Sequence, residues 1–347
     1  MSNEIKKLEE EQEYESISEN VPPSDIIAFN EMRSCLELVR LYSTKQLEIQ
    51  PDFQRDVVWQ RPAQTRFIDS LTKQLPIPSM CISLDSKTDK RLIIDGLQRM
   101  QSMIYFLTND DWELSKLEDI NECLSGKKVS TIKNESDDIY KRVQNVMIPI
   151  TVIRCDYSKK SHNEYLFTIF HRLNSGGMRL NNQEIRNCIY SGVLNDSLKK
   201  LANSKETKAF FGLRKRFSNE EMILRFFAFT DDLEKYNGKL ASFLNNYMFE
   251  NRTKVVGDNA YFSSLEIVEK MINQPSKTFS KTVLEGLLYG VSQNIEILTN
   301  QSHEELKRLF ENFKALPEYS PENLKSALSD KDKVKERLLS AKNCFAL

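Results

Sequence analysis

The stretch Leu92-Ile93-Ile94-Asp95-Gly96-Leu97-Gln98-Arg99 decides the fold of the N-terminal half of the chain. The apolar run before Asp95 predicts a buried strand. After Gly96 the apolar period changes to that of one buried helix face, formed by Leu97, Met100, Ile104 and Leu107. We therefore expect a strand that gives way directly to a helix at this point.

The neighbouring segments complete a small mixed α/β domain. Residues 80–84 and 92–94 predict two strands joined as a hairpin, and residues 47–49 predict a short extended stretch. Residues 146–153 are apolar enough for a buried strand, in which Pro149 favours an edge or a bulge. Prolines and capping patterns place helices between these strands and after them.

The 347 residues predict two domains behind a tail, with an α+β fold class overall. Residues 1–24 are rich in glutamate and lack the apolar core of a signal peptide, so we expect a disordered acidic tail. Residues 25–178 form the mixed domain, with a polar insertion at residues 109–140. In residues 179–347, which begin with a capped helix start at Asn181 and Glu184, helical patterns predominate and predict an all-helical domain.

Composition excludes several classes of function. The 49 basic and 50 acidic residues give a formal charge of -1, so any nucleic-acid site must be a local patch. The six cysteines include no C-x-x-C pair, which argues against a zinc knuckle or a redox motif and for buried reduced thiols. No apolar run approaches the length needed to cross a bilayer, so we expect a cytoplasmic protein without a membrane partner.

The strand-to-helix junction carries the first candidate chemistry. Such a junction presents backbone N–H groups and the positive end of a helix, which suit phosphate. Arg99 can hold a phosphate, Gln98 can orient a base or a water, and Asp95 can bind Mg²⁺ or steer a water. From the spacing alone, the commoner arrangement is a capping Asp95 with an i,i+4 ion pair to Arg99.

Two other polar segments present groups that suit a nucleotide. A turn that exposes Gln54 and Arg55 can hold a nucleotide by phosphate contact and by stacking on an aromatic neighbour. Asn174, Ser175 and Gly176 follow a predicted helix, where a backbone nest can approach a phosphate. The structural alternatives are a surface loop pinned by aromatic residues, which is commoner when that segment is taken alone, and a glycine C-cap.

These segments, in this order, resemble the N-terminal domain of the GmrSD-type restriction systems, a family whose fold is similar to ParB and sulfiredoxin. The resemblance runs from about Leu36 to about Tyr190. The matching pieces are Pro51-Asp52-Phe53-Gln54-Arg55 with Trp59, Leu75-Pro76-Ile77-Pro78, Ile94-Asp95-Gly96-Leu97-Gln98-Arg99, and Phe170-His171-Arg172-Leu173-Asn174-Ser175-Gly176-Gly177 through Leu180, Glu184 and Arg186.

The resemblance implies a ParB-like domain that binds and hydrolyses a nucleoside triphosphate with Mg²⁺ during defence against phage or other foreign DNA. The central motif of the family reads DGQQR, and here Leu97 replaces its first glutamine on the apolar face. Asp95, Gln98 and Arg99 remain as the expected catalytic residues. The expected nucleotide-binding residues are Gln54, Arg55, Gly96, Asn174, Ser175 and Gly176.

The family usually works with an HNH-type nuclease, whose site needs histidine and a bound metal. This chain has only His162, His171 and His303, well separated in sequence, so we expect no nuclease activity of its own and no metal cluster. A separately encoded nuclease is the expected partner. The main alternative is a non-catalytic DNA-binding or sensor and adaptor module, for which the basic and phenylalanine-rich residues 198–217 provide a candidate surface.

Overall fold

The computed structural model describes residues 5, 8–9, 22–49, 59–173, 180–212, 217–272, 275–326 and 328–346. The chain divides into two compact units. The α/β unit is Asn20–Leu180, and the helical unit is Met1–Glu19 together with Asn181–Leu347. The first residues of the chain and its C-terminal half are therefore parts of the same unit.

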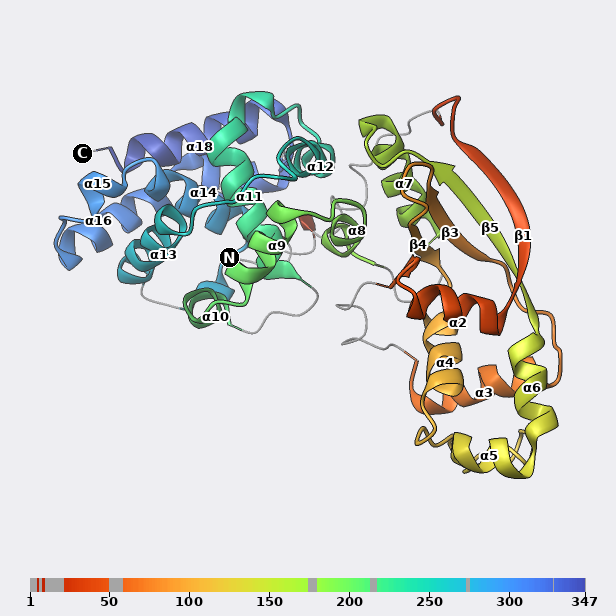
Figure 1. Ribbon diagram of the computed structural model, residues 1–347. Helices are drawn as coiled ribbons and strands as arrows, with labels where there is room; N and C mark the ends of the chain where they lie inside the picture. Colours follow the sequence, from red (N-terminus) through yellow and green to blue (C-terminus); the bar gives the residue numbers. More distant parts are fainter. Residues whose placement is uncertain are drawn as a thin grey trace. The chain divides into compact units, whose positions relative to one another are not determined.

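The α/β unit contains a five-stranded mixed sheet with the strand order β1-β5-β3-β4-β2 (Figure 1). The strands are β1 Ile27–Ser34, β2 Leu47–Glu48, β3 Met80–Asp85, β4 Arg91–Asp95 and β5 Met147–Cys155. β3 and β4 form the predicted antiparallel hairpin, and β1 is antiparallel to β5. β3 runs parallel to β5, and β2 runs parallel to β4. This sheet, followed by a helical half, confirms the predicted α+β class.

One hydrophobic core joins the sheet to a group of helices. These are α2 Cys35–Ser43, α3 Arg61–Thr72, α4 Leu97–Thr108, α5 Val129–Glu135 and α6 Asp137–Asn145. Ile148, Ile150 and Val152 of β5 enter this core, as the two-residue period of a strand requires. Trp112 and Leu124 enter it too, so the polar segment 109–140 closes the core. Helix α7 Lys160–Leu173 contacts β4 and lies beside the sheet in Figure 1.

The sequence pattern does not reveal strand β1, which lies at an edge of the sheet. Its first residues, 27–30, are all exposed, so they lack the apolar alternation of a half-buried strand. Strand β5 lies between β1 and β3, so the predicted edge position of Pro149 is wrong. Pro149 pairs with Met32, whereas the ladder with β3 begins only at Ile150. The missing N–H of Pro149 therefore falls outside the ladder with β3.

The helical unit is built around α14 Lys281–Ser292, whose residues 282–291 are all buried. Helices α11, α13 and α18 pack against α14 (Figure 1). The predicted capped start is confirmed, because Asn181 and Glu184 form a reciprocal capping box at α8. The other helices are α8 Asn182–Ile189, α9 Val193–Ala202, α10 Lys205–Phe211, α11 Ser218–Asp232, α12 Leu240–Glu250, α13 Asn259–Met271, α15 Ile295–Leu298, α16 His303–Lys314, α17 Pro321–Ser326 and α18 Lys331–Cys344, with 3-10 helices at Leu233–Lys235, Ser276–Thr278 and Pro317–Tyr319.

Two residues of the expected disordered tail are buried in the helical unit. Ile5 is fully buried, and Glu9 is 9% exposed. The Glu9 carboxylate accepts hydrogen bonds from the backbone N–H groups of Lys281 and Thr282. The expectation of disorder is wrong for Ile5 and Glu9, because composition carries no sign of partners so distant in the sequence.

Helices α14 and α18 approach closely at Gly290, where an added Cβ would lie 2.7 Å from the carbonyl oxygen of Ala341. At a helix position with free space around it, replacing glycine by alanine raises the free energy of unfolding by about 1 kcal/mol. Here we expect Gly290→Ala to lower the free energy of unfolding by about 1–3 kcal/mol, because backbone must move. Urea unfolding measures this. Gly257→Ala is the control, since no described atom lies within 4 Å of its added Cβ. Equal stability of the two variants would contradict the close approach.

Candidate functional site

Strand β4 passes into helix α4 through a single glycine. Gly96 has a φ of 98°, in the left-handed region that glycine adopts without steric cost. An added Cβ would also lie 2.6 Å from the Cγ atom of Met80. Gly96 is the N-cap, and no side chain among the described residues caps α4. Asp95 is therefore the last residue of β4 and does not cap the helix.

Arg99 joins the two sides of this junction to the residues that lead into β3. Its guanidinium donates to the Asp95 carboxylate at 2.8 Å and to the carbonyl oxygens of Pro78 and Ser79. The Arg99 side chain is 12% exposed, whereas that of Asp95 is 40% exposed. Burial lowers the pKa of Arg99, and Asp95 opposes that shift. The ion pair expected from the i,i+4 spacing is confirmed.

Gln98 connects α4 to Trp59, which follows the segment that contains Gln54 and Arg55. Its Oε1 atom accepts a hydrogen bond of 3.2 Å from the backbone N–H of Trp59. The Trp59 ring packs edge-on against Phe67 of α3, with 5.8 Å between ring centroids. Gln98 therefore holds in place the chain that directly follows residues 51–58.

The predicted site residues fall into two groups. Asp95, Gly96, Gln98 and Arg99 lie together at the β4–α4 junction. The other predicted residues, Gln54, Arg55, Asn174, Ser175 and Gly176, lie outside the described residues. Helix α7, which precedes Asn174, Ser175 and Gly176 in the sequence, packs against β4, and β4 ends at Asp95.

A row of polar groups beside this junction has no clear signal in the sequence. The Ser79 hydroxyl lies 3.3 Å from Thr151 Oγ1, which donates to Asn30 Oδ1 at 2.9 Å. Cys81 of β3 pairs in register with both Asp95 and Thr151, so the row extends from the junction across β5 to β1. Single serine, threonine and asparagine residues in strands or beside them are too common to predict such a row.

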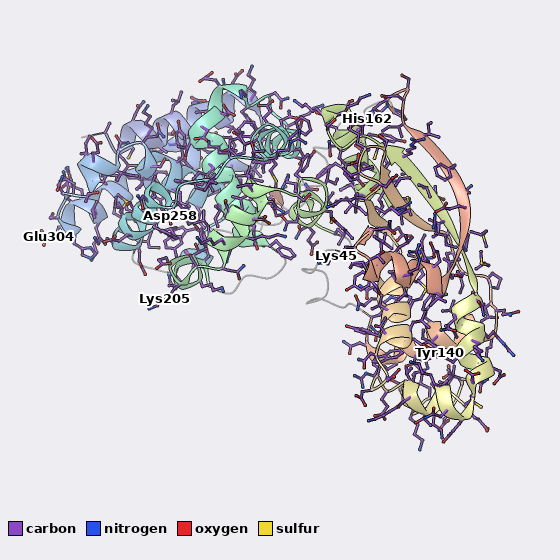
Figure 2. All side chains as sticks on the ribbon, viewed as in Figure 1. Lys45, Tyr140, His162, Lys205, Asp258 and Glu304 are labelled. Carbon is purple, nitrogen blue, oxygen red and sulfur yellow. The ribbon has the colours of Figure 1, made fainter. Side chains whose placement is uncertain are left out.

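His162 lies at the start of α7 (Figure 2), and both of its ring nitrogens form hydrogen bonds. The backbone N–H of Asp156 donates to Nδ1 at 2.9 Å, so the proton resides on Nε2, which donates to Asp25 at 2.9 Å. Hydrogen bonds from Lys159 first, and then from His162, lower the pKa of Asp25 to about 2. These contacts give His162 a structural role.

The described residues contain no group of three or more His, Cys, Asp or Glu side chains placed to hold a metal ion. The six cysteines form no disulfide, and burial raises the pKa of Cys35 and Cys155 to about 12. Cys123 is exposed, so the expectation of buried thiols is wrong at that position. Within the part of the chain that the structure describes, no helix has both the length and the apolar character needed to span a bilayer.

The fold and the site define an α+β unit whose strand–glycine–helix junction carries a carboxylate, an amide and a guanidinium. Residues 37–191 match the family described as GmrSD restriction endonuclease, N-terminal domain. This match confirms the resemblance seen in the motifs and indicates a component of a restriction-type defence system. The matched residues include α8 of the helical unit. No curated protein and no solved structure matches the chain.

Arg99→Lys tests the structural role of the guanidinium. Lysine keeps the charge but lacks the planar fork that reaches three acceptors, so we expect the free energy of unfolding to fall by about 1–3 kcal/mol. Arg66→Lys is the matched control, because its ion pair with Asp119 has side chains 51% and 61% exposed. We expect about 0.5 kcal/mol or less for the control. Urea unfolding that shows equal effects would reduce Arg99 to an ordinary surface ion pair.

The pH dependence of the stability of Asp25→Asn tests the contact between Asp25 and His162. The pKa of Asp25 in the folded protein, about 2, lies below its unfolded value of roughly 3.9. Its contribution to stability is therefore complete above the unfolded pKa and is lost as pH falls towards 2. Asp25→Asn should lower the unfolding temperature at pH 7, and its difference from wild type should shrink as pH falls from neutrality towards the folded pKa of Asp25. Asp111→Asn, at a side chain 90% exposed, should show no such trend.

Proposed function

We propose that the α/β unit binds and hydrolyses a nucleoside triphosphate with Mg²⁺ at the β4–α4 junction, as a regulatory component of a restriction-type defence system. The observation that carries this proposal is a helix that starts at Gly96 without a side-chain cap from the described residues, with Arg99 one turn further on. The N–H groups of such a helix start and its positive end both favour a phosphate.

In this proposal the phosphate competes with Asp95 for the same guanidinium. Arg99 now donates to Asp95 at 2.8 Å, and charge-assisted bonds to a phosphate are of the same kind. Once the guanidinium turns to the phosphate, the half-exposed Asp95 carboxylate becomes available to Mg²⁺. Before the ligand binds, the ion pair thus holds in place both the guanidinium that would bind the phosphate and the carboxylate that would bind Mg²⁺.

The donor set fits Mg²⁺ that arrives with a nucleotide. Mg²⁺ is usually held by one or two carboxylates together with substrate phosphates and waters. Asp95 supplies one carboxylate, and the described residues offer no metal cluster that would bind the ion by itself. Bound Mg²⁺ would neutralise charge on the phosphates during hydrolysis.

In this proposal, Gln98 and the two polar segments at residues 54–55 and 174–176 complete the pocket. The Oε1 atom of Gln98 accepts from Trp59, so its amide NH₂ group is oriented as the donor towards a base or a water. Gln54 and Arg55 precede Trp59 closely in sequence and would bring further polar contacts. Asn174, Ser175 and Gly176 would bring backbone and side-chain donors from the end of α7. A separately encoded nuclease is the proposed partner of this module.

Nucleotide binding and phosphate release by the full chain test the proposal. ATP, GTP and CTP are compared with Mg²⁺, with and without DNA, for wild type, Arg99→Ala and Arg66→Ala. We expect Arg99→Ala to weaken binding by about 10- to 100-fold, which corresponds to the loss of a charge-assisted contact. Arg66→Ala removes an exposed arginine of the same unit and should bind as wild type does.

Three other outcomes would change the conclusion. Binding without phosphate release would leave a nucleotide sensor instead of an NTPase. No binding of any nucleotide under these conditions would refute the proposal for this chain. DNA binding that weakens steeply as salt rises would favour the DNA-binding alternative. The exposed Lys200 and Lys205 could then contact phosphates, but Phe210 and Phe211 are buried and cannot stack on bases.

A further inference from the structure

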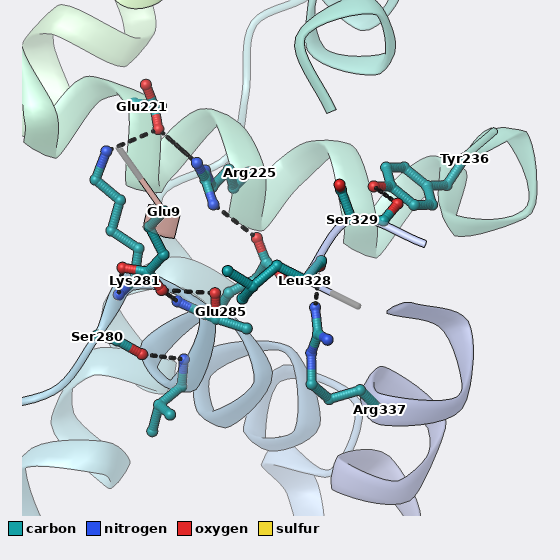
Figure 3. Close-up of polar contacts among 12 residues, drawn as sticks. Glu9, Glu221, Arg225, Tyr236, Ser280, Lys281, Glu285, Leu328, Ser329 and Arg337 are labelled. Atoms are coloured by element: carbon teal, nitrogen blue, oxygen red, sulfur yellow. Dashed lines mark hydrogen bonds and ion pairs between the residues drawn. The ribbon is translucent and has the colours of Figure 1, made fainter. Parts of the chain in front are cut away.

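The helical unit contains a charged cavity that the proposed nucleotide site does not use. Its volume is about 40 Å³, which is room for roughly three water molecules or for one small oxyanion. The charged residues that line it are Glu9, Arg186, Glu221, Arg225, Glu285 and Arg337. Figure 3 shows several of them between α11, α14 and α18. Because buried charges are costly unless they are compensated, the charges that line this cavity need partners of the opposite sign.

Glu9 occupies the position of an anion at the start of α14. Its carboxylate accepts from the Lys281 N–H at 3.2 Å, from the Thr282 N–H at 2.9 Å and from the Thr282 hydroxyl at 2.6 Å. The Ser280 side chain caps the next N–H group, that of Val283. Two backbone N–H groups and a hydroxyl around one carboxylate form the same arrangement that binds a phosphate or carboxylate ligand at a helix N-terminus.

The charges around the cavity are unequal without Glu9. The cations are Arg186, Arg225, Arg337 and the neighbouring Lys281, whereas Glu221 and Glu285 are the other carboxylates. Burial would raise the pKa of Glu221, but Lys281, Arg225 and Arg186 outweigh burial and hold it well below its usual range. Burial raises the pKa of Glu285, and its carboxylate lies 3.3 Å from the Arg225 guanidinium, which opposes that shift. An anion is therefore needed to balance the cations.

Arg337 provides a second observation that points to a ligand. It is 3% exposed and lines the cavity. One of its nitrogens donates to the carbonyl oxygen of Leu328 at 3.1 Å, but Nε has no hydrogen-bond partner among the described residues. An unsatisfied buried donor costs about 1–3 kcal/mol, and more when the group is charged, so a partner within the cavity is strongly favoured.

We propose that this cavity is a binding site for a small oxyanion, a phosphate or a carboxylate group, and that the Glu9 side chain is its built-in competitor. Because Glu9 is part of the same chain, its binding at the site is intramolecular. In the wild type, a free oxyanion therefore competes with a carboxylate that every folded molecule already carries at the site. The Glu9 carboxylate leaves this position when the oxyanion takes the N–H groups of Lys281 and Thr282.

Glu9→Ala tests this competition in the full chain. The unfolding temperature is measured against inorganic phosphate, with acetate as a second probe, at constant ionic strength set by sodium chloride. We expect Glu9→Ala to unfold at lower temperature than wild type without phosphate. Phosphate should then restore its stability at concentrations at least about tenfold lower than those to which the wild type responds. A response to acetate alone would assign the site to carboxylate ligands.

Two variants make the result specific to the cavity. Glu9→Gln fills the same space and still accepts from Thr282 but removes the negative charge, so its phosphate response should lie between those of wild type and Glu9→Ala. Glu9→Ala combined with Arg337→Met should lose the response, whereas phosphate bound at the β4–α4 junction would depend on neither residue. If Glu9→Ala does not fold, Glu9→Asp shortens the side chain by one methylene and should show an intermediate gain. The proposal is overturned if all variants respond to phosphate as the wild type does, which would leave only water in the cavity.

Discussion

The Arg99 guanidinium holds together three segments that the chain keeps apart: the end of β4, the start of α4 and the residues that lead into β3. This contact is possible only because Gly96 turns the chain sharply enough to place Asp95 and Arg99 on one side of the junction. Gln98, on the same turn of helix, then reaches Trp59. The positions of Asp95, Gln98 and Arg99 relative to one another follow from this one turn.

The two units satisfy buried charge in different ways. At the junction, one arginine is paired with a carboxylate that remains half exposed, so the pair can exchange partners at low cost. In the helical unit, Glu221 lies among three cations with almost no exposure to water, where removal of its carboxylate would leave buried positive charge without compensation. The first arrangement suits a ligand that comes and goes, and the second suits a fixed framework around a cavity.

The sequence predicts those features that depend on local pattern. The change of period around Gly96 gives the β4–α4 junction, and Asn181 with Glu184 gives the start of α8. Contacts with backbone acceptors, such as those of Arg99 with Pro78, leave no pattern in the side chains and could not be foreseen. The sequence does not predict strand β1 or the burial of Glu9, for related reasons. An exposed edge strand lacks apolar alternation, and a single buried carboxylate leaves no local pattern in the sequence.

The helical unit contains the first described residues of the chain as well as its C-terminal half, with the α/β unit between them in sequence. During translation, Glu9 therefore emerges 273 residues before its partner Thr282. At about 5–20 residues per second this interval lasts roughly 15–50 s. The α/β unit can finish folding within that time, whereas the helical unit must wait for distant parts of the chain. A nascent chain thus carries a complete sheet domain while its first segment is still without a docking place.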